Sequence, residues 1–123
     1  MVDLSQNRDR MPFKPLMWCG DSRERIREFP REARREAGLQ LNRVQAGREP
    51  DDWKPMSTAG VGVREIRLHE GGEHRVLYVA KFAEAVYVLH AFEKKTRKTP
   101  DKDIDLAERR FRALVGERRR LKL

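Results

Sequence analysis

Positively charged side chains interrupt the apolar segments in the second half of this sequence. Three segments rich in Val, Leu, Ile, Tyr and Phe contain Arg64, Arg67, Arg75, Lys81 and His90, and they are followed directly by Glu93, Lys94, Lys95, Arg97 and Lys98. If the segments are neighbouring antiparallel strands, such side chains lie within several ångströms of one another on one face. The segment from Arg75 to Pro100 is therefore the first candidate for a site that binds a polyanion.

The chemistry open to this segment is limited by what the sequence lacks. It contains no glycine-rich phosphate loop, no Ser/His/Asp arrangement and no carboxylate cluster suited to magnesium, so we expect neither a metal nor a cofactor. Cleavage of RNA without a metal needs a base for the ribose 2′-hydroxyl, cations for the phosphorane and an acid for the leaving oxygen. Histidine, arginine and lysine can fill these roles, and the absence of a 2′-hydroxyl in DNA restricts the route to RNA.

Each of these residues also has a purely structural interpretation. His90 lies between Leu89 and Ala91, which is equally typical of a buried core histidine. Arg67 can form an ordinary surface ion pair with a nearby glutamate. The basic run 94–98 can be a solvated turn. We expect His69 and His74, which flank a predicted hairpin turn, to be surface residues.

Composition narrows the classes of protein and partner. The chain has 123 residues, enough for one domain, and a formal charge of +8, which favours nucleic acid as the partner. Charge that serves solubility, or an acidic protein partner, remains an alternative. The single cysteine, Cys19, excludes an intrachain disulfide, and no stretch approaches about 18 apolar residues. We expect a cytoplasmic protein that neither is secreted nor enters a membrane.

The first half of the sequence predicts a lead-in, a short strand and two helices. Residues 1–14 alternate charged and polar types and predict a flexible lead-in, and Leu16 to Trp18 can form an edge strand. Asp21 is a candidate N-cap for a short helix that ends before Pro30. Pro30 can begin a second helix that stops at Gly47. The buried face of that helix is predicted to contain Ala33, Ala37, Leu41 and Val44.

The second half predicts a loop, three strands and a final helix. Residues 47–60 read as a loop anchored by Trp53. An alternating pattern then predicts an antiparallel meander of three strands: Val61 to His69, Arg75 to Phe82, and Ala85 to Phe92. Thr99 is a candidate N-cap, with Pro100 as the first residue of a helix. The apolar stripe of that helix is Ile104, Ala107, Phe111 and Leu114.

These elements predict an α+β fold. We expect an N-terminal helical hairpin packed on a small antiparallel sheet, together with a C-terminal helix. The helices would cover one face of the sheet, and the open face would bind the ligand. The domain would span residues 15–117, between the flexible lead-in and a basic C-terminal tail at residues 118–123.

Three motifs resemble those of a known family. Residues 63–68 read VREIRL and contain an E-x-R pattern, residues 74–78 read HRVLY, and residues 88–100 read VLHAFEKKTRKTP. They resemble the phage-derived HigB-type branch of the RelE/ParE toxins, whose last motif is H-x-F-x-K-K-T-x-K-T-P. The resemblance implies a RelE-like fold and the toxin of a type II toxin–antitoxin system. It also implies a helix-turn-helix antitoxin as partner, a hetero-oligomer with it, and ribosome-dependent cleavage of messenger RNA.

The resemblance also implies roles for individual residues. Arg75 would contact the scissile phosphate, and Lys95 would bind phosphate or protonate the leaving group. His90 would be the general base, because its ordinary pKa of about 6.5 suits proton transfer near neutrality. His74 replaces a tyrosine of the second motif, which removes a stacking ring. The residues implied to bind RNA are Arg64, Arg67, Lys81, Phe92, Lys94 and Lys98.

Two other functions fit the same residues. One is a ParE-like inhibitor of DNA gyrase that is not an enzyme, and the other is an accessory protein that binds nucleic acid through its basic face. The combination of His90 with the lysine run favours the endoribonuclease, because a gyrase inhibitor has no evident need for a proton-transfer residue.

Overall fold

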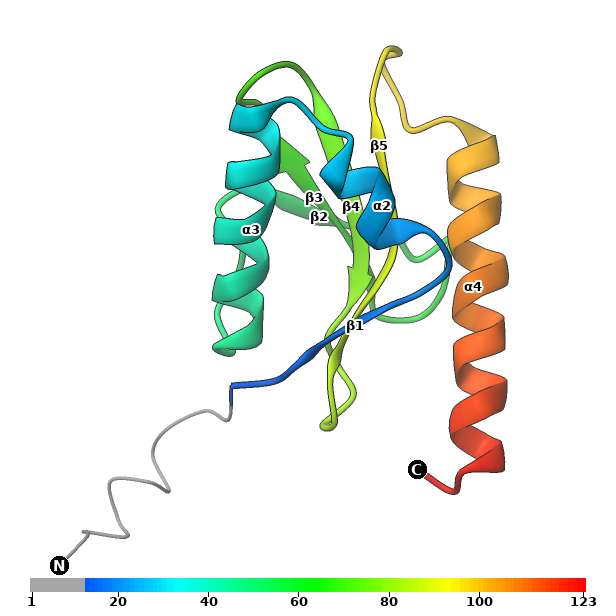
Figure 1. Ribbon diagram of the computed structural model, residues 1–123. Coiled ribbons are helices and arrows are strands. Elements are labelled where there is room, and N and C mark those ends of the chain that lie inside the picture. Colours follow the sequence, from blue (N-terminus) through cyan, green and yellow to red (C-terminus); the bar gives the residue numbers. More distant parts are fainter. Residues whose placement is uncertain (1–12) are drawn as a thin grey trace, which may run out of the picture.

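A five-stranded mixed sheet forms the centre of the molecule (Figure 1). The structure is a computed structural model that describes residues 13–123. The strands lie in the order β1-β5-β4-β3-β2, and β1 is parallel to β5 whereas all other neighbours are antiparallel. Their bounds are Leu16–Trp18 (β1), Trp53–Pro55 (β2), Val63–Leu68 (β3), His74–Val79 (β4) and Val86–Glu93 (β5).

Within residues 13–123, three helices pack on this sheet, and they cover both of its faces. They are α2 (Ser22–Arg27), α3 (Arg31–Gln45) and α4 (Asp101–Arg120). Figure 1 shows the strands between α3 on one side and α4 on the other. The prediction that one face of the sheet stays open is therefore wrong.

The predicted N-terminal helical hairpin is also wrong. The helix α2 has only six residues and packs mainly against β5, whereas the long helix α3 buries its own apolar side on the sheet. Pro30 separates them in an extended conformation, with ψ at 154°. Two amphipathic helices in succession need not pair, because each can bury its apolar side on the sheet. The fold is α+β, but its N-terminal part is two separately docked helices.

The core consists of two apolar layers, one on each face of the sheet. On the first, the predicted face of α3 packs with α2 on the sheet, and the buried residues include Ala33, Ala37, Leu41, Val44, Ile66, Val76 and Val88. On the second, the predicted stripe of α4 packs on Val63, Leu77, Leu89 and Phe92. The sequence therefore predicted the buried sides of both long helices correctly.

The predicted meander is confirmed as β3, β4 and β5, and β1 forms the predicted edge strand. The strand β2 lies inside the segment predicted to be a loop. Between β4 and β5 the register shifts: Leu77 pairs with His90 and Tyr78 with Val88, which leaves Leu89 as an extra residue. This bulge allows Leu89 and His90, although adjacent in sequence, both to contact α4.

Both ends of the described chain add detail. Residues 1–12 of the expected lead-in lie outside the described residues, but the Lys14 ammonium donates to the carbonyl oxygens of Ala80 (2.6 Å) and Phe82 (2.9 Å).

The N-cap of α4 is Pro100 and not Thr99, and α4 continues to Arg120. Within residues 13–123, no helix is both long enough and apolar enough to cross a membrane.

Two glycines give a matched test of this packing. Gly60 has φ at +155°, and a Cβ added to it would lie 2.3 Å from Cδ2 of Phe111 on α4. We expect Gly60→Ala to lower the free energy of unfolding by about 1–3 kcal/mol, because the ring must move. Gly38, in the middle of α3, has nothing within 4 Å of such a Cβ. Gly38→Ala should raise the stability by about 0.5–1 kcal/mol. Urea unfolding of both variants measures the difference, and equal effects would contradict the observed docking of α4.

Candidate functional site

A fully buried carboxylate, Glu65, holds several cations together on the face of the sheet that α4 partly covers. Its Oε1 atom lies 3.7 Å from Nζ of Lys54, 3.9 Å from Nε of Arg67 and 3.8 Å from Nε of Arg75. Its Oε2 atom accepts a hydrogen bond from the Thr99 hydroxyl. Glu65 thus joins three strands and the loop that precedes α4.

The strand register explains why these side chains meet. Lys54 on β2 is paired with Glu65, and Arg67 on β3 is paired with Arg75 on β4. Paired residues share a face, and so do residues two apart on one strand, which places Glu65 and Arg67 together. Phe92 on β5 is the next partner of Arg75 across the sheet.

Arg75 is the most enclosed of these cations. Only 5% of its surface is exposed, and its guanidinium donates to the His74 carbonyl (2.8 Å) and to the Glu73 carboxylate (2.9 Å). The side chains of Arg67 and Lys54 are each 35% exposed. Arg75 therefore supplies charge from beneath the surface, while Arg67 and Lys54 can touch a ligand directly.

Lys94 adds a further cation to this cluster. Burial lowers the pKa of its ammonium, and the positive charges of Arg75, Lys54 and Arg67 lower it further, against an opposite effect of Glu65. Its backbone N–H donates to the Glu73 carbonyl (2.8 Å), which fixes the chain after β5 beside the β3–β4 turn. A lysine with a lowered pKa releases its proton more readily near neutral pH.

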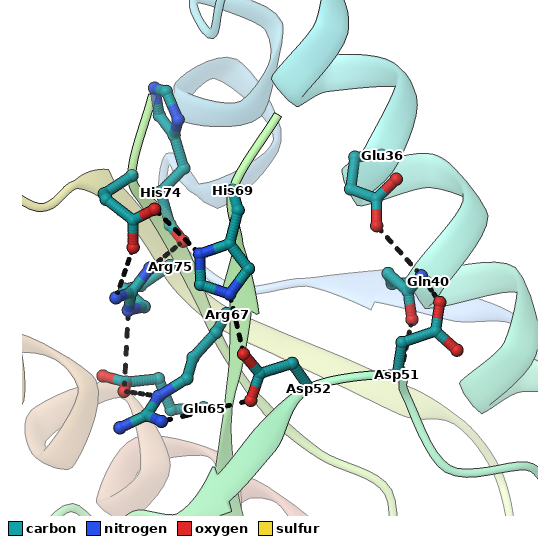
Figure 2. Close-up of polar contacts among 10 residues, drawn as sticks. Glu36, Gln40, Asp51, Asp52, Glu65, Arg67, His69, His74 and Arg75 are labelled. Carbon is teal, nitrogen blue, oxygen red and sulfur yellow. Dashed lines mark hydrogen bonds and ion pairs between the residues drawn. The ribbon is translucent and has the colours of Figure 1, made fainter. Parts of the chain in front are cut away.

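The two arginines belong to a ring of alternating charges (Figure 2). His69 contacts two carboxylates, with Nε2 2.7 Å from Asp52 and Nδ1 2.7 Å from Glu73. Asp52 lies 4.0 Å from Arg67, Glu73 lies 2.9 Å from Arg75, and Glu65 lies between the two arginines. In order around the ring the members are Arg67, Asp52, His69, Glu73, Arg75 and Glu65.

The ring fixes the charge of His69. A carboxylate only accepts hydrogen bonds, so an imidazole bonded to two carboxylates must donate from both nitrogens and be protonated. The hydrogen bond to Asp52, followed by the one to Glu73, raises the pKa of His69 accordingly. The six ring members then balance in charge, and Lys54 and Lys94 leave the cluster with two excess positive charges.

The helix α3 anchors one corner of this ring. Gln40 on α3 donates to the Asp51 carboxylate (2.8 Å) and accepts from the Asp51 backbone N–H (2.8 Å), as Figure 2 shows. The next residue, Asp52, accepts a hydrogen bond from the Arg67 backbone N–H through its carbonyl (2.9 Å). The position of Asp52 beside Arg67 and His69 therefore depends on α3.

His90 lies beside the cluster and forms a dyad with α4. Its Nε2 atom is 2.7 Å from the Asp103 carboxylate, whereas Nδ1 has no hydrogen-bond partner among the described residues. His90 is 2% exposed, and burial lowers its pKa despite the opposite effect of Asp103. The neutral imidazole is thus favoured, with Nε2 as the donor, and Nδ1 is an unpartnered acceptor that has almost no accessible surface.

The other predicted site residues are distributed around the molecule. Arg64 points to the opposite face, where it stacks on Trp53 (4.0 Å) and pairs with Glu49 (2.7 Å). Lys81 lies near Phe82 and Phe111, away from Glu65. Lys98 is exposed.

Two further predicted residues lie on β5 or just after it. Phe92 is 8% exposed and stacks on His90, with 5.3 Å between ring centroids. The Lys95 side chain is 81% exposed and pairs with Glu93 (3.7 Å). The predicted surface position of His74 is wrong, because its ring packs on Phe29 and is 1% exposed.

Several members of this site were missed in the sequence. Thr99 was interpreted as an N-cap and His69 as a plain surface residue, and Asp103 was given no role in the site. Lys54 lies in a segment expected to be a loop. Glu65 had a usable signal, because its spacing of two from Arg67 places both on one strand face. Within residues 13–123, no group of three or more His, Cys, Asp or Glu residues could hold a metal.

The fold and site define a small α+β protein with a cationic cluster on one sheet face. The family model described as Phage derived protein Gp49-like (DUF891) matches residues 24–112, which is most of the chain and includes the whole cluster. The chain therefore belongs to the Gp49-like family of phage-derived proteins. A search of curated proteins found no match. A search of solved structures found none either.

Removal of the central carboxylate should destabilise the protein. We expect Glu65→Gln to lower the free energy of unfolding by about 3–5 kcal/mol, because three cations lose their shared counter-charge in a buried position. Glu49→Gln is the matched control, since Glu49 pairs with Arg64 at the surface, and its effect should stay below about 1 kcal/mol. Denaturant unfolding of both variants measures the difference. Comparable losses would show that Glu65 has no special role.

The ring also predicts a pH dependence of stability. Because the folded state raises the pKa of His69, its contribution is complete below the unfolded pKa of about 6.5 and declines as pH rises through the folded value. We expect the stability difference between wild type and His69→Gln to be larger at about pH 6 than at about pH 8.5. Unfolding curves across this range provide the measurement. A difference that is constant with pH would exclude a protonated His69 between the carboxylates.

Proposed function

We propose that this protein is the toxin of a type II toxin–antitoxin system and a metal-independent endoribonuclease of the RelE/HigB type that cleaves messenger RNA on the ribosome. The observation that carries this proposal is the cationic cluster around Glu65 beside His90, whose buried Nδ1 has no hydrogen-bond partner among the described residues. Membership of a phage-derived family agrees with a toxin at a coarse level. A helix-turn-helix antitoxin, the ribosome and a cytoplasmic location belong to the same proposal.

The cluster is suited to an RNA phosphate. Arg67 and Lys54 present charge at the surface, and Arg75 adds charge below them. Guanidinium groups bind phosphate oxygens through two hydrogen bonds and retain their charge at any physiological pH. Preorganised cations stabilise a phosphorane more than a ground-state phosphate, because they meet the charge that develops in the transition state.

His90 is suited to the role of general base. Asp103 orients the imidazole through Nε2, as the third member orients the base in many hydrolytic sites. His90 is the diagonal neighbour of Arg75 across the β4–β5 pair, and such neighbours lie about 7–8 Å apart. A nucleotide whose phosphate is near Arg75 can therefore place its ribose near His90.

The proposed reaction is an internal transfer at phosphorus. Nδ1 of His90 takes the proton of the ribose 2′-hydroxyl, and the 2′-oxygen forms a bond to phosphorus. The bond between phosphorus and the 5′-oxygen of the next nucleotide breaks, and that oxygen takes a proton from Lys94. The products are a 2′,3′-cyclic phosphate and a free 5′-hydroxyl. Lys95, which is exposed at the end of β5, would bind a neighbouring phosphate.

Two arginines on one strand test this proposal. Arg67 and Arg64 lie on β3 with similar exposure, 35% and 36%, and each forms an ion pair, but they point to opposite faces. We expect Arg67→Ala to slow cleavage of messenger RNA roughly 10²-fold or more, whereas Arg64→Ala keeps nearly the wild-type rate. Primer extension on messages recovered from in vitro translation measures the rate, and circular dichroism verifies folding.

The same assay separates the functional classes. If translation continues, or stops while the message stays intact, the nuclease proposal fails, and a gyrase supercoiling assay then tests the non-enzymatic alternative. If messages are cleaved but Arg67→Ala and His90→Ala both cleave at the wild-type rate, the class stands and the assigned site is wrong.

A further inference from the structure

The outer side of α4 carries arginines that the proposed cleavage site does not use. Residues 109–123 contain seven arginines and lysines but only one acidic residue. Two of the seven, Arg110 and Arg118, turn towards the protein, where they pair with Asp21 (2.7 Å) and Glu84 (2.6 Å). The other five are exposed. The second half of α4 therefore presents a strongly positive surface to the solvent.

Helical spacing aligns the exposed arginines. Arg109, Arg112, Gly116 and Arg119 follow one another at spacings of three, four and three, which places them on one side of α4. The first and the last of them are about 15 Å apart along the helix axis. Gly116 has nothing within 4 Å of an added Cβ, so this side of the helix is open at its centre. The outer side of α4 is thus a row of guanidinium groups.

Arg118 fixes this row relative to the sheet. Its guanidinium forms two hydrogen bonds with the Glu84 carboxylate (2.6 and 3.1 Å) and lies 3.7 Å from the centre of the Phe82 ring. The last turns of α4 are therefore attached to the connection between β4 and β5. A ligand then meets cations whose positions are already set, which lowers the entropic cost of binding.

Nearby carboxylates neutralise the row only weakly. Arg112 pairs with Glu108 (3.2 Å), but the arginine side chain is 75% exposed, and exposed pairs of this kind contribute little. Arg109 and Arg119 form no ion pair with any residue between 13 and 123. Guanidinium groups bind phosphate oxygens through paired hydrogen bonds. The row is therefore suited to a ligand that carries several phosphates.

The shape of this side favours double-stranded RNA. Single strands are bound in basic grooves with aromatic platforms, whereas Phe111, the one aromatic residue of α4, packs towards the sheet. Because the opposite side of α4 is packed on the sheet, the helix cannot enter the major groove of DNA, which is about 8.5 Å deep. The minor groove of an RNA helix is wide, shallow and bordered by phosphates, so it accepts a surface helix.

We propose that the outer side of α4, from Arg109 to Arg119, binds the phosphate backbone of double-helical RNA. This inference rests on the proposed function, because a ribosome offers such RNA wherever the message would be cleaved. The surface docks the protein, while the cluster around Glu65 acts on the message. Contacts to phosphates position a protein without reading the sequence, so this surface has no base preference.

Binding of an RNA hairpin measures this contact without any cleavage. The probe is a fluorescein-labelled stem of about 16 base pairs, added to the full chain and followed by fluorescence anisotropy at several salt concentrations. We expect the double variant Arg112→Ala, Arg119→Ala to bind roughly tenfold more weakly. The slope of log Kd against log salt should also fall by about two, one unit for each lost phosphate contact.

Two arginines of α3 provide the matched control. Arg31 and Arg35 are exposed as well, and α3 lies on the other side of the sheet from α4 (Figure 1). The double variant Arg31→Ala, Arg35→Ala loses the same charge and should bind the hairpin with the wild-type affinity and salt slope. Circular dichroism verifies that both double variants are folded.

The outcomes distinguish this surface from the nuclease. Hairpin binding that only the α4 variant weakens, in a chain that cleaves no RNA, keeps the surface and refutes the proposed function. Equal losses in the two double variants, in a chain that does cleave messages, refute the surface and keep the nuclease, because net charge then explains the binding. The surface proposal also fails if single-stranded RNA or a DNA duplex of the same sequence binds more tightly than the hairpin.

Discussion

The structure depends on one buried negative charge. Glu65 has no exposed surface, yet it is the shared counter-ion of three cations, the buried Arg75 and the partly exposed Arg67 and Lys54, that would otherwise repel one another. Through Thr99 it also fastens the loop before α4 to β3, so the same carboxylate fixes the cluster and positions the helix. Coulomb interactions are strong where water is excluded, which makes a single carboxylate sufficient for this purpose.

Periodicity in the sequence predicted the local structure well. The meander, the edge strand β1 and the buried sides of α3 and α4 all follow from spacing alone. The packing of α4 on a second sheet face did not follow, because an amphipathic helix shows which side is buried but not which surface covers it. A signal was present nonetheless. Residues 86–92 read VYVLHAF, and such a nearly continuous apolar run is typical of a strand covered on both faces.

The site was predicted less completely, for a reason that strand geometry makes clear. Arg64 and Arg67 are three residues apart, so they point to opposite faces, and a count of basic residues treats them as equals. Arg67 and Arg75 were correctly expected to lie close together. The position of His90 follows from the bulge at Leu89, which alternation does not reveal. Lys54 and Asp52 come from a segment without periodicity, so only the tertiary structure brings them to the cluster.

The ring of alternating charges limits how this protein can evolve. Its six members come from a loop, two strands and the turn between the strands, and each has an oppositely charged neighbour on both sides. Loss of the charge at any one position leaves each of its two neighbours with one counter-charge in place of two. Accepted changes in such a ring are therefore expected to occur in compensating pairs, with a loss at Asp52 or Glu73 accompanied by a change at His69. The six positions are therefore expected to change together, although they are spread over more than one sequence motif.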